Sequence, residues 1–333
     1  MAARAGVSIT TVSHALNGKG RITMSTRERV LKAASDLGYV ANPNAAGLRT
    51  GQSSLFAIQI SPSGGNSLVP NSSYFNDMLN GASAEALSAG HPLVVLPREL
   101  TESELIALGI TRAIVVDPIG TEPLVQFLLE TGGTLVTIGR LPDRMLPQSP
   151  SRLFFVDNDA HAVARTALSH LQSAGYRHPA VLTSPTSVSF FRDCVDEARA
   201  WAARTGCAVP IARIRNENES AARRAVAALL DAHPEVDSLF TTSEAGAIGA
   251  VSVVRQRGWV VPGDFGIVAG NDTSLLRYSS PSISAIDLHP DSLGRAAVRR
   301  LLLAGRPPVT DTDAAPTVIG HTLRRRDSTR RSS

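Results

Sequence analysis

The sequence predicts an α/β protein with a helix-turn-helix head at its N-terminus and a two-lobed body built on parallel sheets. Three observations carry this prediction. Residues 1–41 contain helix signals on both sides of a glycine turn. Residues 42–53 form a linker with small residues, glycine and proline. The rest of the chain alternates short apolar runs with helical runs, which is the pattern of repeated strand–helix units.

The head begins with the end of a helix at residues 2–5, a tight turn at Gly6 and a second short helix. Ser8 is a good N-cap for that second helix. Val12 and Leu16 are four residues apart, so they share a face and we expect them to pack inward. The residues then left on the outer face are Ile9, Thr10, Ser13 and His14.

The outer face of the second helix has the chemistry of a DNA reader. In a helix-turn-helix, the second helix enters the major groove. Threonine and serine hydroxyls contact bases or phosphates, Ile9 suits a thymine methyl group, and His14 can donate to a base edge. The alternative is a solvated surface helix that binds nothing.

Two features further along extend this interpretation. We expect Thr23 to cap a third helix. The amide dipoles at the beginning of that helix would then point at a phosphate, with Arg27 close by. Asn42–Arg49 is a small-residue segment with one projecting leucine, Leu48. Such a leucine can enter the minor groove and unstack a base step. The alternative for Leu48 is a place in a small satellite core.

The charge distribution agrees with a nucleic-acid partner for the head. Residues 1–52 carry seven lysines and arginines against two acidic residues, a net charge of +5, whereas the whole chain carries +4. A basic head on a nearly neutral body is the electrostatic footprint of a nucleic-acid-binding module. A second basic cluster lies between Arg324 and Arg331. We expect residues 324–333 to be a disordered tail rather than a DNA contact.

The head and several later stretches of the chain resemble the LacI/GalR family of bacterial transcriptional regulators. The resemblance runs over nearly the whole chain and is most specific in the head. The matching stretches are Ala5–Ser8, Thr11–Ser13, Asn17, Thr26–Arg27, Val30, Ala33–Ala34, Leu37–Tyr39, Asn42–Pro43, Asp157–Asn158, Gly246–Ala250, Val261–Asp264 and Gly270–Asp272. The resemblance implies a homodimer on a pseudo-palindromic double-stranded DNA operator, with a small-molecule effector that changes the affinity for DNA.

The resemblance also assigns roles in the head. It places Ile9, Thr10 and His14 at base-reading positions and Thr11 and Ser13 at phosphate contacts. Leu48 matches the family's intercalating leucine, and Ala45 matches a small residue that faces the groove. The DNA-binding set that follows is Ser8, Ile9, Thr10, Thr11, Ser13, His14, Asn17, Thr23, Arg27, Asn42, Ala45, Leu48 and Arg49.

We expect the first helix of the head to be cut short. Family members carry an extra stretch that ends in Asp-Val, and Met1 stands where that valine would be. The hypothesis is that a GTG valine codon was taken as the start codon and that the protein begins upstream. So short a first helix is unstable by itself.

The body contains two series of strand–helix units. In the first lobe the expected strands are 55–60, 93–96, 113–116 and 135–138, with helices at 74–89 and 102–108 and one more before the last strand. In the second lobe the expected strands are 154–156, 180–182, 238–240 and 266–268, with helices at 160–173, 188–204, 218–231 and 245–257. Two such series form two lobes, with a ligand site between them at the carboxyl ends of the strands.

The resemblance adds that the body is periplasmic-binding-protein-like and that the chain crosses between the lobes three times. We therefore expect residues 54–152 and about 289–312 in the first lobe. We expect residues 153–288 and about 313–323 in the second lobe.

Asp272 is the main candidate for an effector contact. It follows the apolar run 266–269 and therefore lies at the carboxyl end of a strand, where this architecture binds ligands. By resemblance, it matches the effector-binding aspartate, Arg192 matches an effector-binding arginine, and Tyr74 and Phe75 match an aromatic pair. The effector-binding set is Tyr74, Phe75, Arg192, Ser243, Glu244, Asn271 and Asp272.

Each of these assignments has a structural alternative. Asp272 could cap a turn, Arg192 could form a surface ion pair, and the aromatic pair could be core. Ser243-Glu244 stands where many family members have Asn-Asp, and Asn271 replaces an aromatic residue. These departures weaken the prediction of a simple pyranose, and the expected effector is a sugar or a related metabolite.

Composition and motifs exclude several other classes. Hydrophobic residues make up 43% of the chain and charged residues 19%, as in ordinary globular proteins. There is no glycine-rich phosphate loop, nucleophile elbow or metal-like spacing of histidine and cysteine, so we predict neither an enzyme nor a cofactor. Cys194 and Cys207 are expected to be free thiols. No long apolar run could span a membrane.

The remaining alternatives concern the partner of the body. An exported solute-binding protein would share the two lobes, but it should carry a signal peptide and lack a basic head. We see no signal peptide and therefore predict a cytoplasmic protein. A ligand-binding body that has lost DNA binding is the second alternative. The sequence names neither the effector, nor the operator, nor the direction of the response. The C-terminus lacks heptads, which favours a dimer over a tetramer.

Overall fold

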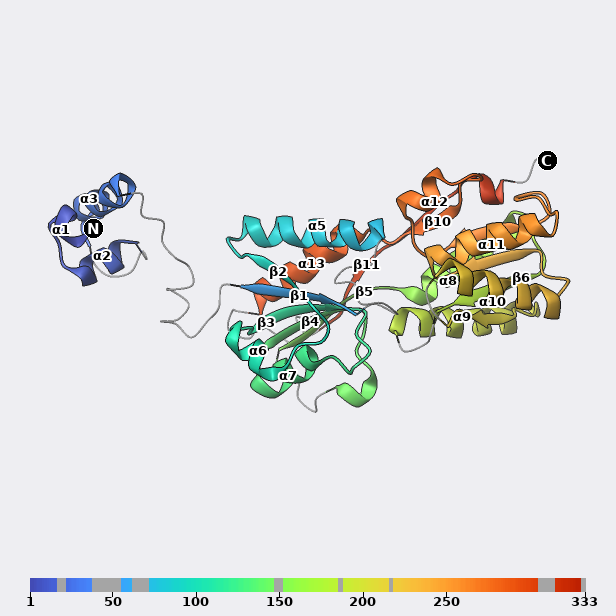
Figure 1. Ribbon diagram of the computed structural model, residues 1–333, viewed down its shortest axis with the longest axis horizontal. Helices are drawn as coiled ribbons and strands as arrows, with labels where there is room; N and C mark the ends of the chain where they lie inside the picture. The colour runs from blue at the N-terminus through green and yellow to red at the C-terminus, as the bar shows by residue number, and fades with distance from the viewer. Residues whose placement is uncertain are drawn as a thin grey trace. The chain divides into compact units, whose positions relative to one another are not determined.

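The computed structural model describes residues 1–16, 22–37, 55–61, 72–146, 152–184, 188–215, 218–304 and 315–330 (Figure 1). The chain divides into two compact units, residues 1–54 and 55–333. Five residues of the predicted DNA-binding set lie outside the described residues: Asn17, Asn42, Ala45, Leu48 and Arg49.

The described residues of the first unit form the helices α1 (Ala2–Ala5), α2 (Ile9–Leu16) and α3 (Met24–Asp36). Gly6 ends α1 with a left-handed φ of 62°, a conformation that glycine adopts without strain. Ala5, Ala15, Val30 and Ala33 form the buried core of the unit. Val12 and Leu16 pack against that core, as their spacing predicts, and so do Met1, Val7 and Ile22. The helix-turn-helix prediction is confirmed.

The first lobe of the body is a six-stranded parallel sheet in the order β11-β5-β4-β3-β1-β2. Its strands are β1 (Phe56–Ile60), β2 (Leu93–Leu96), β3 (Arg112–Val116), β4 (Thr134–Ile138), β5 (Leu153–Asn158) and β11 (Thr317–Ile319). One face is covered by α5 (Ser73–Ser88) and α13 (Pro290–Leu303), the other by α6 (Glu102–Ala107) and α7 (Pro123–Thr131) (Figure 1). A 3-10 turn, η1 (Asp143–Met145), follows β4.

The second lobe repeats this plan in the order β12-β10-β9-β8-β6-β7. Its strands are β6 (Pro179–Thr183), β7 (Ile211–Arg213), β8 (Ser238–Thr241), β9 (Gly266–Ala269), β10 (Ser284–Asp287) and β12 (Thr322–Arg324). Its helices are α8 (Ala160–Ser173), α9 (Ser189–Thr205), α10 (Glu219–Ala232), α11 (Glu244–Gln256) and α12 (Ser274–Tyr278), followed by the 3-10 turn η3 (Asp327–Thr329). Among the described strands of this sheet, β12 alone runs antiparallel, against β10.

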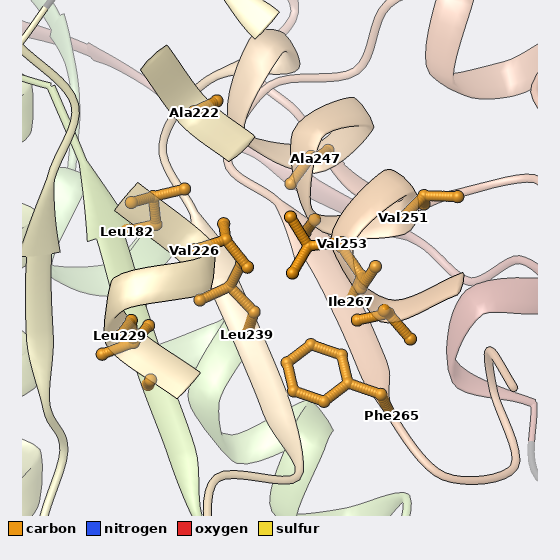
Figure 2. Packing of buried hydrophobic residues seen from close by; sticks show 14 of the residues in the cluster. Leu182, Ala222, Val226, Leu229, Leu239, Ala247, Val251, Val253, Phe265 and Ile267 are labelled. Atoms are coloured by element: carbon orange, nitrogen blue, oxygen red, sulfur yellow. The ribbon is translucent and has the colours of Figure 1, made fainter. Parts of the chain in front are cut away.

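Two cores cover the two faces of the second sheet. On one face α10 and α11 pack on the strands through Val226, Leu239, Val253 and Ile267, with Phe265 at the end of the cluster (Figure 2). On the other face α8 and α9 supply a second cluster that includes Leu168, Tyr176 and Trp201. The α/β layering that the sequence predicts is therefore confirmed in both lobes.

The structure corrects the expected lobe boundaries. We expected residues 153–156 to open the second lobe, but Leu135 of β4 pairs in register with Leu153, which places β5 in the first sheet. We also expected residues 313–323 in the second lobe, but β11 (Thr317–Ile319) pairs with β5 in the first sheet, and the second sheet is joined only from Thr322 onward. Apolar character predicts a strand without saying which sheet it joins, because pairing is decided by contacts distant in sequence. The chain therefore crosses after β5, after β10 and after β11.

The structure also corrects the expectation of a disordered tail from residue 324 onward. Residues 322–324 form β12, and Ser328 is fully buried beside β9. Ser328 Oγ donates to the carbonyl of Ile267 (2.6 Å), and Ser328 Oγ also accepts from the backbone N–H of Ser284 (2.8 Å). These bonds satisfy polar groups that would otherwise be buried without partners, so a basic composition does not keep residues 324–330 in solvent.

Candidate functional site

The predicted reading face of the head is exposed. The Ile9 side chain is 80% exposed, and Thr10 and His14 are also exposed. Ser13 is half-buried and has an interaction partner in the structure. An isoleucine this exposed in so small a unit contributes little to the core, so its burial energy is available for a partner.

Hydroxyl groups organise the beginnings of α2 and α3. Ser8 Oγ accepts from the backbone N–H of Thr11 (3.1 Å), which makes Ser8 the N-cap of α2. Thr23 Oγ1 accepts from the backbone N–H of Thr26 (3.3 Å) and caps α3, as predicted. The Thr11 hydroxyl also bonds to that of Ser8 (2.9 Å).

The side chain of Arg27, which belongs to α3, contacts the end of α2. Its Nε donates to the carbonyl of Ala15, in the last turn of α2, at 3.3 Å. A guanidinium at the carboxyl end of a helix is stabilised by the helix dipole. Arg27 therefore helps to hold α2 against α3, and its remaining N–H groups are the ones that could reach a phosphate.

In the body, the carboxyl ends of strands from the two sheets face each other. Arg140 follows β4 of the first lobe, and its backbone N–H donates to Ser189 Oγ of the second lobe (2.9 Å). The Arg140 guanidinium also forms an ion pair with Asp193 of α9, whose side chain is 8% exposed. At a second point, the backbone N–H of Ser274 donates to Ser73 Oγ (2.9 Å).

Tyr74 and Phe75 open α5 at this boundary. Their rings meet edge to face, with centroids 5.1 Å apart. Phe75 packs against the first-lobe core, whereas Tyr74 packs against the cores of both lobes. Burial raises the pKa of the Tyr74 phenol well above its usual value, and the carboxylates of Asp117 and Asp157 add to that shift. Phe75 therefore fits the alternative of core packing, and Tyr74 lies where the lobes meet.

Asp157, at the end of β5, lies in an acidic environment. Its pKa is raised from 3.8 to about 6, mainly by burial and further by Asp193 and Asp159. The backbone N–H of Asn158, which donates to Asp157 Oδ1 (2.8 Å), and the nearby Arg140 act in the opposite direction. This environment joins groups from both lobes, which the sequence alone did not reveal.

Arg192 shares a carboxylate with Arg140. Arg192 Nε lies 3.6 Å from Asp193 Oδ1, and the Arg192 side chain is 41% exposed. Only part of its hydrogen-bonding capacity is used in this way. The structure thus contains the ion pair that was the alternative for Arg192, at a position beside the lobe boundary.

Asp272 lies just after β9, and its side chain is 5% exposed. Its Oδ2 accepts from Arg326 (2.7 Å) and Arg277 (3.3 Å). Among the described residues, Asp272 Oδ1 has no hydrogen-bond partner, and the same holds for Asn271 Oδ1 and Ser72 Oγ. The predicted effector carboxylate is therefore already ion-paired on one oxygen and unpartnered on the other.

Arg326 is the residue that the sequence interpretation missed. It belongs to the segment that was expected to be disordered, and its side chain is only 14% exposed. Its Nη1 donates to the carbonyl of Ile283 (2.8 Å) and its backbone N–H to Ser284 Oγ (2.8 Å). A contact across this much sequence leaves no local signal, and only the pairing of β10 with β12 brings it about.

Ser243 and Glu244 begin α11. Ser243 is its N-cap, and Ser243 Oγ accepts from the backbone N–H of Gly246 (3.2 Å). That bond occupies the Ser243 oxygen with the helix itself. Glu244 is half-buried in the first turn, where the helix dipole favours a carboxylate. Of the two residues, Glu244 is therefore the better candidate for a ligand contact through its side chain.

Within the described residues, no group of three or more histidine, cysteine or acidic side chains is arranged to hold a metal ion. Cys194 and Cys207 are free thiols, as expected, and Cys194 is fully buried. Burial raises the pKa of both thiols. No helix in the described part of the chain is both long enough and apolar enough to cross a bilayer.

Two family models match the chain. Residues 1–42 match the bacterial regulatory proteins of the lacI family, and residues 168–329 match a periplasmic binding protein-like domain. The chain is 25% identical to the HTH-type transcriptional regulator CelR of Thermobifida fusca, over 91% of this chain and 89% of the relative. It is 26% identical to the HTH-type transcriptional regulator AscG of Escherichia coli K12, over 91% and 90% of the two chains.

Solved structures agree in fold. A complex of the transcriptional regulator CelR with cellobiose superposes with a TM-score of 0.73, at 23% identity and 98% coverage of both chains. A lac repressor dimer bound to its operator and to the anti-inducer ONPF superposes with a TM-score of 0.77, at 21% identity, covering 98% of this chain and 97% of the other.

Proposed function

We propose that this chain, which joins a LacI-family helix-turn-helix to a periplasmic-binding-protein-like domain and whose homologues are LacI/GalR transcriptional regulators, is a ligand-responsive repressor. It binds a pseudo-palindromic operator as a homodimer. The observation that carries the proposal is the exposed face of α2, where Ile9, Thr10 and His14 are presented on a basic head.

The chemistry of that face suits direct readout of bases. A methyl-rich side chain discriminates thymine by contact, and a hydroxyl and an imidazole supply donors and acceptors for base edges. The capped amino ends of α2 and α3 offer N–H groups and a positive dipole to phosphates. One head covers a half-site, so two heads in a symmetric dimer require an inverted repeat.

The effector site lies between the lobes in this proposal, and its ligand is a sugar or a related metabolite. Three observations support it. Asp272 has one unpartnered oxygen, Tyr74 lies at the lobe boundary, and Arg192 keeps free hydrogen-bonding capacity beside it. The free Asp272 oxygen can accept a hydrogen bond from a polyol hydroxyl, and Arg192 can donate one to a hydroxyl oxygen. The apolar face of a sugar ring packs on aromatic rings.

The response follows from the two lobes. A ligand that binds the closed body more tightly than the open one shifts the population toward closure. In the dimer, closure moves the two first lobes relative to each other. This movement changes the separation of the two points at residue 55 from which the linkers lead to the heads, and thereby the placement of the two heads on the operator. The coupling equals the difference in ligand affinity between the two states and acts reciprocally on DNA affinity.

The test is fluorescence anisotropy with labelled DNA from upstream of the gene, titrated across a salt series. The variant combines Ile9→Ala, Thr10→Ala and His14→Ala. We expect a loss of specific binding, since each base contact is worth about 1–3 kcal/mol, with little change in the salt slope. Ser35→Ala, at an exposed position of α3, is the matched control and should bind as the unaltered chain does.

Two outcomes would contradict the proposal. If the triple variant binds as tightly as the unaltered chain, then α2 is not the reading element. If the folded, unaltered chain binds this DNA no better than an unrelated sequence at every salt concentration, the DNA function is in question. A ligand-binding body that lacks a DNA function would then be the better interpretation.

A further inference from the structure

The three crossings between the lobes lie side by side. The last register pair of β5 and β11 joins Asn158 to Ile319, so the first and third crossings leave the first sheet together. Asp287 of β10 pairs with Thr322 of β12, so the second crossing leaves the second sheet beside the point where the third crossing enters it. The third crossing is therefore adjacent to each of the other two.

A single side chain links all three crossings. Asn158 lies on the first crossing and is 7% exposed. Its Nδ2 donates to the carbonyl of Leu288 (3.2 Å), on the second crossing, and to the carbonyl of Ile319 (2.9 Å), on the third. Both amide hydrogens of Asn158 are used, and each goes to a different crossing.

Two histidines add weaker links at the edge of this cluster. His289 Nε2 bonds to Thr322 Oγ1 (3.0 Å), which connects the second crossing to the third. His321 Nε2 bonds to Thr166 Oγ1 of α8 (2.9 Å), which connects the third crossing to the helix that follows the first. Both bonds involve half-buried side chains near the surface, whereas the Asn158 amide is buried.

We propose that Asn158 is a positioning residue that makes the three crossings bend as one hinge, so that the lobes close about a single axis. If the three crossings bent separately, the lobes could twist and slide relative to each other as well as close. Motion of one crossing alone would break one of these bonds and leave the buried Asn158 amide with an unpaired donor, which is costly. The inference rests on the proposed function, in which lobe closure carries the signal.

The experiment measures the distance between the lobes by pulsed electron spin resonance in the intact, ligand-free chain. Spin labels are attached at Ile106→Cys on α6 and Val260→Cys before β9, which are 61% and 60% exposed. Cys207 is replaced by serine, and Cys194 can stay because it is fully buried. Dilution with unlabelled protein makes the distance within one chain dominate.

We expect one narrow distance distribution for the unaltered hinge. Asn158→Ala and Asn158→Asp both remove the two donors, and Asp keeps the size of the side chain, so both should broaden the distribution. The matched control is Asn218→Ala. It removes the cap of α10, a bond from the Ala221 backbone N–H to Asn218 Oδ1 (2.9 Å) that lies within one lobe. This control lowers stability but should keep the narrow distribution.

The proposal is overturned if both Asn158 variants keep the width of the unaltered chain, or if Asn218→Ala broadens the distribution equally. Should Asn158→Ala not fold, Asn158→Asp decides the matter, because it removes both donors and keeps the size of the side chain. It should broaden the distribution, and an unchanged width would contradict a linked hinge. No DNA or effector is present, so the result is independent of whether an operator is bound.

Discussion

The sequence correctly predicts the position of Asp272 in the fold, but it does not predict the arginines that surround its carboxylate. The sequence places it at the end of a strand, and the structure finds it there, buried and paired with Arg326 and Arg277. The carboxylate is therefore a structural element as well as a candidate ligand contact. Replacing it tests both roles at once, and they have to be separated by stability.

Removal of Asp272 should destabilise the body. Asp272→Ala leaves the guanidinium of Arg326 buried without its carboxylate, which costs about 3–5 kcal/mol. Arg277→Ala removes only the partner that is 52% exposed and should cost less than about 1 kcal/mol. Urea unfolding of both variants, of Arg326→Ala and of the double variant Asp272→Ala with Arg326→Ala measures these costs. The double variant should cost less than the sum of the two single variants.

Equal costs for Asp272→Ala and Arg277→Ala would contradict the assigned pairing. If the costs differ as expected, a lost ligand response in Asp272→Ala has to be interpreted beside its stability. Asp272→Asn is then the better variant for ligand binding, because it keeps the volume of the side chain and an oxygen acceptor.

Asp157 should make stability depend on pH. Its pKa in the folded chain is about 6, above the ordinary 3.8, so the folded state holds the proton more tightly than the unfolded state does. This contribution to stability is fully present below pH 3.8 and is lost as the pH rises through 6. Asp157→Asn cannot ionise and keeps an Oδ1 acceptor, so it should be more stable than the unaltered chain at pH 7.

The measurement is the free energy of unfolding of both chains between pH 4 and pH 8. The difference between them should grow from about pH 4 to pH 6 in favour of the variant and stay constant above pH 6. Asp143→Asn, at an exposed carboxylate of η1, controls for the loss of one negative charge. A difference for Asp157→Asn that is the same at every pH would contradict the raised pKa.

At the scale of elements, the crossing of α5 and α13 depends on two glycines. A Cβ on Gly294 would lie 2.1 Å from the carbonyl oxygen of Met78, and one on Gly81 would lie 2.2 Å from that of Asp291. The backbones of the two helices therefore touch directly. These helices cover one face of the first sheet, although residues 89–289 separate them in sequence.

Gly294→Ala should destabilise the first lobe although it improves helix propensity. Alanine normally stabilises a helix interior by about 1 kcal/mol relative to glycine. Here the clash falls on backbone, which cannot move aside cheaply, and overpacking costs about 1–3 kcal/mol. Asn80→Ala, at an exposed position of α5, is the control and should stabilise slightly. An increase in the urea midpoint for Gly294→Ala would contradict this packing.

The elements that the sequence predicted well are those with a strong local pattern. β1, β3, β4, β8 and β9 come from mainly apolar runs, and the structure has them close to the expected bounds. β7 and β10 were missed because Ile211–Arg213 and Ser284–Asp287 are short and partly polar. The prediction that β5 belongs to the second lobe was wrong, because the pairing of β5 with β4 leaves no local signal in the sequence.

At the scale of the molecule, a basic helix-turn-helix head followed by two parallel-sheet lobes could be predicted, because the head has its own helix and charge pattern and the body repeats strand–helix units. The contacts between parts could not. The ion pair of Arg140 with Asp193, the link from Asn158 to Leu288 and the pair of Asp272 with Arg326 all join residues that are distant in sequence. The first two of these contacts join the lobes or their crossings, whereas the third lies within the second lobe, so the way the lobes meet is the aspect that the sequence predicts least.

The most direct test of the central claim is a selection of random double-stranded DNA by the full chain, carried out beside the variant with alanine at Ile9, Thr10 and His14. The account predicts that the unaltered chain enriches an inverted repeat with half-sites of one kind, and that the variant loses this enrichment while its body stays folded. Enrichment of the same repeat by the variant, or no enriched sequence with the folded unaltered chain, would contradict it.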